Sequence, residues 1–191
     1  LALLGCFLCP PVVFAAGPAS IAAGQDHACI VTAGRGVRCW GRNASGVLGD
    51  GTSADRSTPV AVATLGSGVL AMEAGYQHTC AITRSRGVMC WGINSSGQLG
   101  DGTQTNRYYP AAVSQFYDDT SALAVGSSHS CVLTLNGGAF CWGANSNGQL
   151  GDERLTPYVK DAYLRWTYLG RQQMTLGIEP SLSIDFVESV W

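Results

Sequence analysis

Charged residues are scarce in this chain of 191 residues: Asp, Glu, Lys and Arg make up 13% of it, and the formal net charge is −2. A protein that binds nucleic acid neutralises phosphates with a basic patch or stripe, and the sequence offers none. After the N-terminal segment, no apolar run approaches the length of a membrane-spanning helix. We therefore expect no nucleic-acid partner and no membrane span in the repeats that follow.

The motifs of common catalytic sites are missing as well. The glycine-rich stretch GQLGDGT at 97–103 lacks the Gly-Lys-Ser/Thr with which a phosphate-binding loop contacts phosphates and magnesium. No Ser, Cys or paired-carboxylate constellation stands out from the rest of the sequence. We predict that the protein is not an enzyme, that it has no catalytic residues and that it needs no cofactor.

What the chain does have is an internal repeat. His27, His78 and His129 lie 51 residues apart, and each begins the same frame: Cys two residues later, a second Cys ten residues after that, and then Trp-Gly. A period near 50 with several short apolar runs per unit is typical of a module that stacks on its neighbours, as the blades of a β-propeller do. We predict an all-β fold of three such blades.

The second repeat shows how one blade is built. Short apolar runs at 69–74, 78–83 and 88–91 are separated by turn-forming residues, and a glycine-rich stretch leads to a fourth run around 110–113. Four strands in sequence order predict one antiparallel sheet. The second strand is small or apolar on both faces, which is expected where blades pack face to face.

Two cysteines recur in each repeat, on either side of a short turn. An antiparallel hairpin would place the two members of a pair directly opposite each other, close enough for a disulfide. Two alternatives are free buried thiols and a metal site, for which His27, Cys29 and Cys39 offer ligand-type side chains. No fourth ligand recurs, and the repeats lack the C-x-x-C of most structural zinc sites, so we predict no metal. The predicted disulfides join Cys29 to Cys39, Cys80 to Cys90, and Cys131 to Cys141.

The first 17 residues, LALLGCFLCPPVVFAAG, carry no charge and end in small residues. They are typical of the apolar core and cleavage region of a secretory signal, without its initiator Met and basic leader. Export would supply an oxidising compartment, and removal of Cys6 and Cys9 with the signal would leave six cysteines for three pairs. Two alternatives are a lipid anchor through Cys6 and a buried strand of a preceding blade. We expect a secreted, extracellular or periplasmic protein.

The unit G-x-x-H-x-C, followed by C-W-G-x-N-x-x-G-x-L-G-D-G-T, resembles the repeat of the regulator of chromosome condensation family over about residues 18–160. The resemblance implies a propeller of seven four-stranded blades that serves as a binding scaffold. Members include a nuclear guanine-nucleotide exchange factor, secreted inhibitors of β-lactamase and receptor ectodomains with paired cysteines. The cysteine pairs of this chain resemble the exported branch.

The chain departs from the family pattern after its second repeat. The third repeat ends in Gly151-Asp152-Glu153-Arg154 instead of GDGT, and the next His and Cys would fall at Pro180 and Leu182. We therefore expect the third repeat to be shortened and the end of the chain to lie outside the frame. The expected divisions are an apolar leader at 1–17, repeats at 18–68, 69–119 and 120–165, and a non-repeat tail at 166–191.

Residues that recur in every repeat answer a structural need, whereas a catalytic residue is usually unique. We expect the three histidines to hydrogen-bond a neighbouring loop. We expect Trp40, Trp91 and Trp142 to pack against the next blade. In the glycine-rich loops, the recurring Asn and Asp side chains favour hydrogen bonds to their own backbone, with calcium binding as the alternative. These loop residues are Asn43, Asn94 and Asn145 with Asp50, Asp101 and Asp152.

Binding is expected where the repeats differ from one another. The richest candidate surface is the aromatic group Tyr108, Tyr109, Phe116 and Tyr117. The function we favour is a non-catalytic, exported, disulfide-stabilised propeller that binds a protein or a surface ligand. The alternatives are an intracellular exchange factor or GTPase regulator, and an accessory domain of a larger extracellular adhesin or enzyme. Asn43 and Asn94 also begin N-glycosylation motifs, which matter only in a eukaryotic secretory pathway.

Overall fold

The computed structural model describes residues 20–114 and 119–151, together with the backbone of three further strands at 158–159, 163–169 and 173–179. All of these strands belong to antiparallel sheets, which confirms the predicted all-β fold. Within the described residues, no helix has the length and apolar character needed to cross a bilayer. The leader at 1–17 and its Cys6 lie outside the described part of the chain.

The first two repeats each form one four-stranded sheet whose strands pair in sequence order. The first sheet contains β1 (Ser20–Ala23), β2 (His27–Val31), β3 (Val37–Gly41) and β4 (Arg56–Ala61). The second contains β5 (Val69–Ala74), β6 (His78–Thr83), β7 (Val88–Gly92) and β8 (Arg107–Ala112). The first three strands of the second repeat lie where the sequence predicts them. Its fourth strand begins at Arg107, earlier than expected, because Arg107 already pairs with Gly92.

The third sheet starts in the same way and then differs. Its first strands are β9 (Thr120–Val125), β10 (His129–Thr134) and β11 (Ala139–Ala144). Two separate strands then pair with β11, namely β12 (Tyr158–Val159) and β13 (Tyr163–Leu169), and β14 (Gln173–Glu179) pairs with β13. The position of the fourth strand is thus occupied in two pieces, and β13 spans the repeat boundary expected at residue 165.

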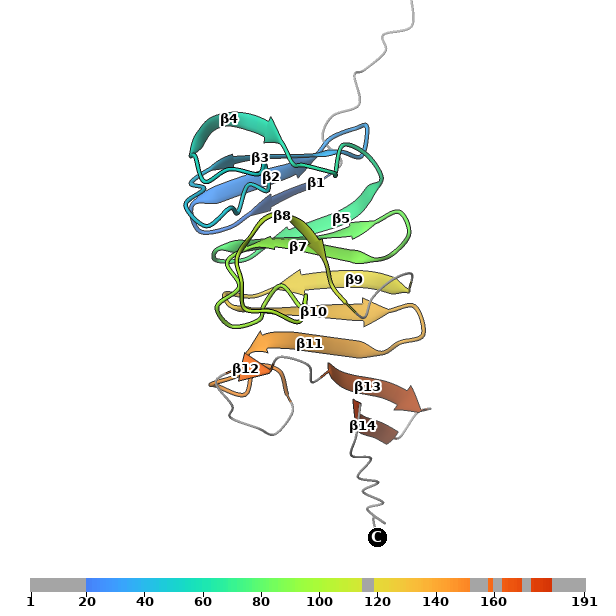
Figure 1. The fold of residues 1–191 in the computed structure, drawn as a ribbon. Helices are drawn as coiled ribbons and strands as arrows, with labels where there is room; N and C mark the ends of the chain where they lie inside the picture. Colours follow the sequence, from blue (N-terminus) through green and yellow to red (C-terminus); the bar gives the residue numbers. More distant parts are fainter. Residues whose placement is uncertain (1–19, 115–118, 152–157, 160–162, 170–172, 180–191) are drawn as a thin grey trace, which may run out of the picture.

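The hydrophobic core lies between the sheets. One cluster joins buried residues of the first repeat, such as Cys29 and Val31, to Met72, Ala81 and Trp91 of the second. A second cluster joins the second repeat to the third in the same way. The sheets are stacked in chain order (Figure 1). Every residue of β6 except the last is buried, as predicted for a strand enclosed on both faces.

The first strands lie closest to the neighbouring repeats, whereas the fourth strands are exposed. β1 and β2 contact β5, and β5 and β6 contact β9. All residues of β4 and β8 are exposed or half-buried, and each strand carries a proline, Pro59 or Pro110. Proline has no backbone N–H, so it weakens an edge strand as a template for pairing with another chain.

A disulfide closes the central hairpin of each sheet. Cys29 faces Cys39 in the register of β2 and β3, and the other two pairs occupy the same position in their own sheets. The Cα atoms of each pair are 4.0–4.1 Å apart, and all three pairs are bonded. Four of the six cysteines, those of the first two repeats, have no exposed surface. The structure therefore contains the cysteine-paired blades that the resemblance implies.

Candidate functional site

Each glycine-rich loop is organised around one buried asparagine. The side-chain nitrogen of Asn94 donates to Oδ1 of Asp101 (3.1 Å) and to the carbonyl oxygens of Thr103 (3.0 Å) and Thr105 (3.1 Å). Its oxygen accepts a hydrogen bond from the Leu99 backbone at 3.0 Å. Asn43 makes the same set of contacts in the first repeat. These bonds confirm that the recurring asparagines cap their own loops.

In the first two repeats, the aspartate of the loop is held by an arginine at the start of the fourth strand. Nε of Arg107 lies 2.6 Å from Oδ2 of Asp101, and Thr103 donates its hydroxyl to Oδ1 at 2.7 Å. Burial raises the pKa of Asp101, but the hydrogen bonds from Thr103 and Arg107 outweigh this effect and hold the pKa below its ordinary value. Both carboxylate oxygens are thus engaged within the protein. Asp152 lies outside the described residues.

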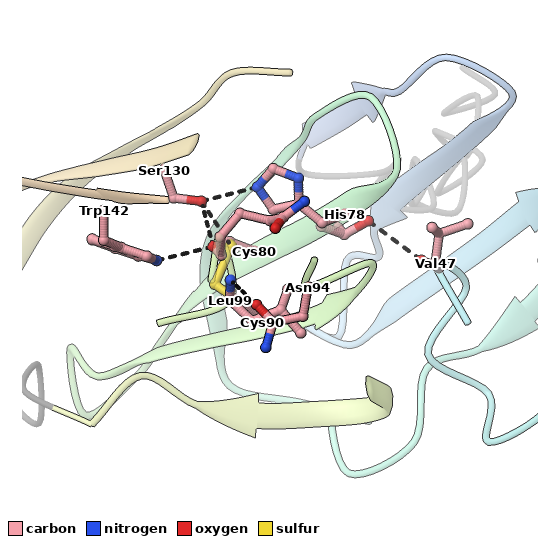
Figure 2. Close-up of a disulfide and its surroundings, with 10 residues drawn as sticks. Val47, His78, Cys80, Cys90, Asn94, Leu99, Ser130 and Trp142 are labelled. Atoms are coloured by element: carbon pink, nitrogen blue, oxygen red, sulfur yellow. Dashed lines mark hydrogen bonds between the residues drawn. A yellow bond between two sulfur atoms is a disulfide. The ribbon is translucent and has the colours of Figure 1, made fainter. Parts of the chain in front are cut away.

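The histidines of the first two repeats each contact the following repeat, as Figure 2 shows for His78. Nε2 of His78 lies 2.9 Å from the hydroxyl oxygen of Ser130, and that hydroxyl donates to the carbonyl oxygen of Gln98 at 2.9 Å. Because the hydroxyl hydrogen is used for Gln98, Nε2 of His78 is the donor in the first bond. His27 contacts Thr79 in the same way at 2.9 Å. The expected partner was a loop; the observed partner is a hydroxyl on the second strand of the next repeat, which in turn binds the loop.

Burial keeps these imidazoles neutral. Desolvation lowers the pKa of His78, and together with the smaller effect of the neighbouring imidazoles of His129 and His27 it brings the pKa to about 3. Burial also lowers the pKa of His27 to about 4, although Asp26 opposes this effect. Nδ1 of His78 is buried and has no hydrogen-bond partner among the described residues. A proton on either ring would therefore be poorly stabilised in the folded protein.

Trp91 and Trp142 anchor to the preceding repeat, not to the next one as expected. Nε1 of Trp91 donates to the carbonyl oxygen of Val47 at 2.8 Å, and Nε1 of Trp142 donates to that of Gln98 at 2.9 Å. Both rings are buried, whereas Trp40 is half-buried. The carbonyl of Gln98 thus accepts hydrogen bonds from both Trp142 and Ser130. One loop carbonyl per repeat fixes the position of the following blade.

The contact between loop and tryptophan depends on glycine. Gly100 has a φ of +66°, and a Cβ at this position would lie 2.6 Å from Nε1 of Trp142. Gly102 has a similar φ of +74° but no atom within 4 Å of its Cβ position. We expect Gly102→Ala to cost about 1 kcal/mol through backbone strain alone. We expect Gly100→Ala to cost about 3 kcal/mol, because it also displaces the indole.

Urea unfolding of the two variants measures this difference, and Gly102→Ala is the control for backbone strain. Equal midpoints for the two variants would show that the indole does not depend on the glycine.

The predicted aromatic surface is partly assembled in the structure. Tyr108 and Tyr109 lie on β8, and their exposed fractions are 38% and 58%. The Tyr108 carbonyl accepts a hydrogen bond from Gly51 of the first repeat at 3.0 Å, so the tyrosines bridge two repeats. They line an open cavity of about 420 Å³ with Arg107 and Pro110. Phe116 and Tyr117 lie outside the described residues.

A second, smaller cavity was not predicted. It has a volume of about 90 Å³ and lies between the first two repeats, lined by Asp26, His27, Arg42 and Tyr76, among others. Arg42 and Asp26 form an exposed ion pair at 3.5 Å, and Tyr76 is 49% exposed. The signal for this site was a break in the repeat frame. The positions of Asp26 and Arg42 are uncharged in the other two repeats.

Both cavities lie at the same end of the sheets. His78 pairs with Gly92, and Gly92 pairs with Arg107, so the start of the second strand and the start of the fourth strand are neighbours. The glycine-rich loops leave the sheets at this end. Among the described residues, no group of three or more His, Cys, Asp or Glu side chains is placed to hold a metal ion.

Two family models match the chain, and both are described as the regulator of chromosome condensation (RCC1) repeat. One matches residues 19–47, 69–98 and 121–149, and the other matches residues 37–82 and 87–133. Together the matched segments run through all three sheets.

Several curated proteins are similar to the chain. It is 34% identical over 150 residues to the ultraviolet-B receptor UVR8 of Arabidopsis thaliana, which covers 75% of this chain and 34% of that protein. It is 34% identical over 137 residues to the human X-linked retinitis pigmentosa GTPase regulator, and the match covers 70% of this chain and 13% of that protein. It is 33% identical over 134 residues to the human probable E3 ubiquitin-protein ligase HERC4, and the match covers 69% of this chain and 13% of that protein. The chain thus spans about a third or less of the length of these relatives.

Solved structures share the fold. The crystal structure of Prp20p from Saccharomyces cerevisiae matches with a TM-score of 0.68 at 20% identity, covering 78% of this chain and 38% of that one. Human WBSCR16 matches with a TM-score of 0.64 at 16% identity, covering 84% and 51%. The predicted propeller blades are therefore confirmed, and a total of seven blades stays a prediction.

Proposed function

The chain belongs to the regulator of chromosome condensation repeat family, and from this premise we propose that it is a non-catalytic, protein-binding propeller scaffold exported to an oxidising compartment. The observation that carries this proposal is the disulfide in the central hairpin of every sheet. Disulfides are rare in the cytosol, where thiols are kept reduced, and common in exported proteins. One bridge at the same place in each of three repeats fits a chain that folds under oxidising conditions.

The proposed contact surface is the end of the sheets that carries the glycine-rich loops. Tyr108 and Tyr109 supply exposed aromatic area there, and Tyr76 with the Asp26–Arg42 ion pair supplies a second contact region. Tyrosine and arginine are among the residue types enriched at the energetic centre of protein interfaces. A tyrosine side chain is rigid, so fixing its position on binding costs little conformational entropy.

The similar proteins support a scaffold and not a shared reaction. Their names describe a receptor, a GTPase regulator and a ubiquitin ligase, yet the region they share with this chain is the same repeat. A domain that recurs beside such different activities is best explained as a binding module. The small share of each relative that is matched also supports the alternative of an accessory domain in a larger protein.

A second candidate function is regulation of a GTPase inside a cell. The observation in its favour is the 34% identity to a human protein named as a GTPase regulator. This function requires reduced cysteines and a change in the rate at which a small GTPase releases its nucleotide. The exported scaffold requires oxidised cysteines and no such change.

The state of the thiols in the natural host separates the two functions. We expect the six repeat cysteines of the full chain to resist alkylation by a maleimide under denaturing conditions and to react only after reduction. We also expect no acceleration of fluorescent guanine-nucleotide release from a set of purified small GTPases. Free thiols in protein that is acid-quenched directly from the host would reject the exported scaffold, and free thiols with accelerated release would establish the second function.

A further inference from the structure

Two loop asparagines stand in the N-glycosylation motif Asn-x-Ser/Thr. The motifs are Asn43-Ala44-Ser45 in the first repeat and Asn94-Ser95-Ser96 in the second. Glycosylated asparagines normally lie on the surface of a protein, where the sugar extends into solvent. Both of these side chains are instead fully buried. The motif and the structure therefore make opposite demands on the same two residues.

The amide nitrogens are fully used in the closed loops. Nδ2 of Asn43 is 3.0 Å from the carbonyl oxygen of Thr52, 3.1 Å from that of Ala54 and 3.1 Å from Oδ1 of Asp50. Nδ2 of Asn94 has the corresponding partners at 3.0–3.1 Å. An amide nitrogen has only two hydrogens, so both are engaged in each loop. Neither is available to a transferase in the folded protein.

Glycosylation would change this nitrogen directly. The nitrogen forms a bond to the anomeric carbon of an oligosaccharide and loses one hydrogen as a proton, while the sugar leaves its lipid-linked diphosphate carrier. The product keeps a single N–H and carries a large polar group. A loop with that group at its centre loses a donor to buried carbonyl oxygens and has no room for the first sugar. It cannot close as observed.

We propose that Asn43 and Asn94 are modification sites only before their loops close, so that attachment of an N-linked oligosaccharide and folding of the blade exclude each other. This inference rests on the proposed export insofar as it concerns a eukaryotic secretory pathway. There, the folded protein carries unmodified asparagines, and a chain that has been glycosylated at either position fails to fold. Each of these two loops must therefore close before the transferase modifies its asparagine.

The third repeat supplies a natural control. Asn145 is buried at the equivalent position, but it is followed by Ser146 and Asn147, so no motif exists. Asn147 is exposed, and Asn147→Ser recreates the Asn-Ser-Ser motif of the second repeat. Conversely, Ser45→Ala and Ser96→Ala remove both natural motifs and keep the asparagines. These substitutions change acceptor status without changing the side chain that organises each loop.

The test is expression of the full chain in cultured animal cells behind a cleavable secretory leader, with an extra glycosylation motif in a C-terminal tag. The supplied leader makes the outcome independent of where the natural host places the protein. Peptide mass spectrometry after glycosidase treatment reports occupancy at each asparagine, in secreted and in retained protein. The tag shows that a given chain met the transferase.

We expect secreted protein to be glycosylated at the tag alone and retained protein to be glycosylated at Asn43 or Asn94 as well. We expect the Ser45→Ala/Ser96→Ala variant to raise the secreted fraction several-fold and Asn147→Ser to lower it. Brief dithiothreitol treatment, which delays disulfide formation, raises occupancy in the natural chain. Secreted, protease-resistant protein with a glycan at Asn43 or Asn94 would overturn the proposal. Absence of glycans at both positions even under dithiothreitol would overturn it too, because the sites would then be closed to the transferase throughout.

Discussion

Acidification from pH 7 to pH 4.5 is expected to lower the free energy of unfolding by about 5 kcal/mol through two histidines alone. His27 and His78 have folded-state pKa values of about 4 and about 3, against an ordinary value of 6.5. In the unfolded chain both rings bind a proton below pH 6.5, whereas in the folded protein both stay neutral. The unfolded state therefore binds more protons, and stability falls as the pH falls.

The pH window identifies the groups responsible. The loss begins near pH 6.5 and continues at about 1.4 kcal/mol per pH unit for each histidine until the folded pKa is reached. The lowered pKa values of Asp50 and Asp101 add a further loss only below their ordinary value of 3.8. Urea denaturation at a series of pH values between 3 and 7 separates the two ranges.

His78→Gln is the matched variant for this measurement. Glutamine keeps a nitrogen donor for the Ser130 hydroxyl and does not titrate, so the slope between pH 4 and pH 6 is expected to fall by the contribution of one histidine, about 1.4 kcal/mol per pH unit. The variant is less stable at pH 7, but the change in slope is independent of that offset. A slope that does not change in His78→Gln would show that the acid sensitivity arises elsewhere.

Asn94→Asp is expected to lower the free energy of unfolding by about 3–5 kcal/mol. The new oxygen would replace a nitrogen that donates to two carbonyl oxygens and to the carboxylate of Asp101. Three donor contacts become contacts between acceptors, and a carboxylate in this buried position must either carry an uncompensated charge or take up a proton.

Ser95 is the exposed neighbour of Asn94, and Ser95→Ala is the control variant. We expect it to change the free energy of unfolding by less than about 0.5 kcal/mol. Thermal unfolding at pH 7 compares the two variants with the natural chain. A melting temperature for Asn94→Asp equal to that of Ser95→Ala would show that the loop does not depend on this amide.

The repeat frame predicted which residues are structural, but not which neighbour each of them contacts. Alternation and turn residues located the first three strands of the second repeat, because these signals are local to the chain. The contacts of Trp91 and His78 run in opposite directions around the stack, to the preceding and the following repeat. A sequence repeat is the same whichever face of a sheet meets which neighbour, so it contains no signal for this direction.

The sequence also predicted only part of the candidate binding surface. The sequence singled out Tyr108 and Tyr109 by their residue type, and the structure adds that they bridge two repeats through the Gly51 contact. The Asp26–Arg42 cavity was missed because Asp26 lies just before β2 and Arg42 just after β3, separated in sequence and unremarkable in type. Their only signal is that they break the repeat frame.

The position of the disulfides within single hairpins also governs how reliably they form. The partners of each bridge are separated by ten residues, whereas Cys39 and the next cysteine along the repeats, Cys80, are about four times farther apart. Closing the longer loop costs about 1 kcal/mol more chain entropy, so proximity favours the native partner even in an unfolded chain. Each bridge can form as soon as its own hairpin emerges during synthesis, without waiting for the other blades. In an oxidising compartment we therefore expect oxidation to proceed blade by blade, with fewer wrong pairings to correct than if the partners were distant in sequence.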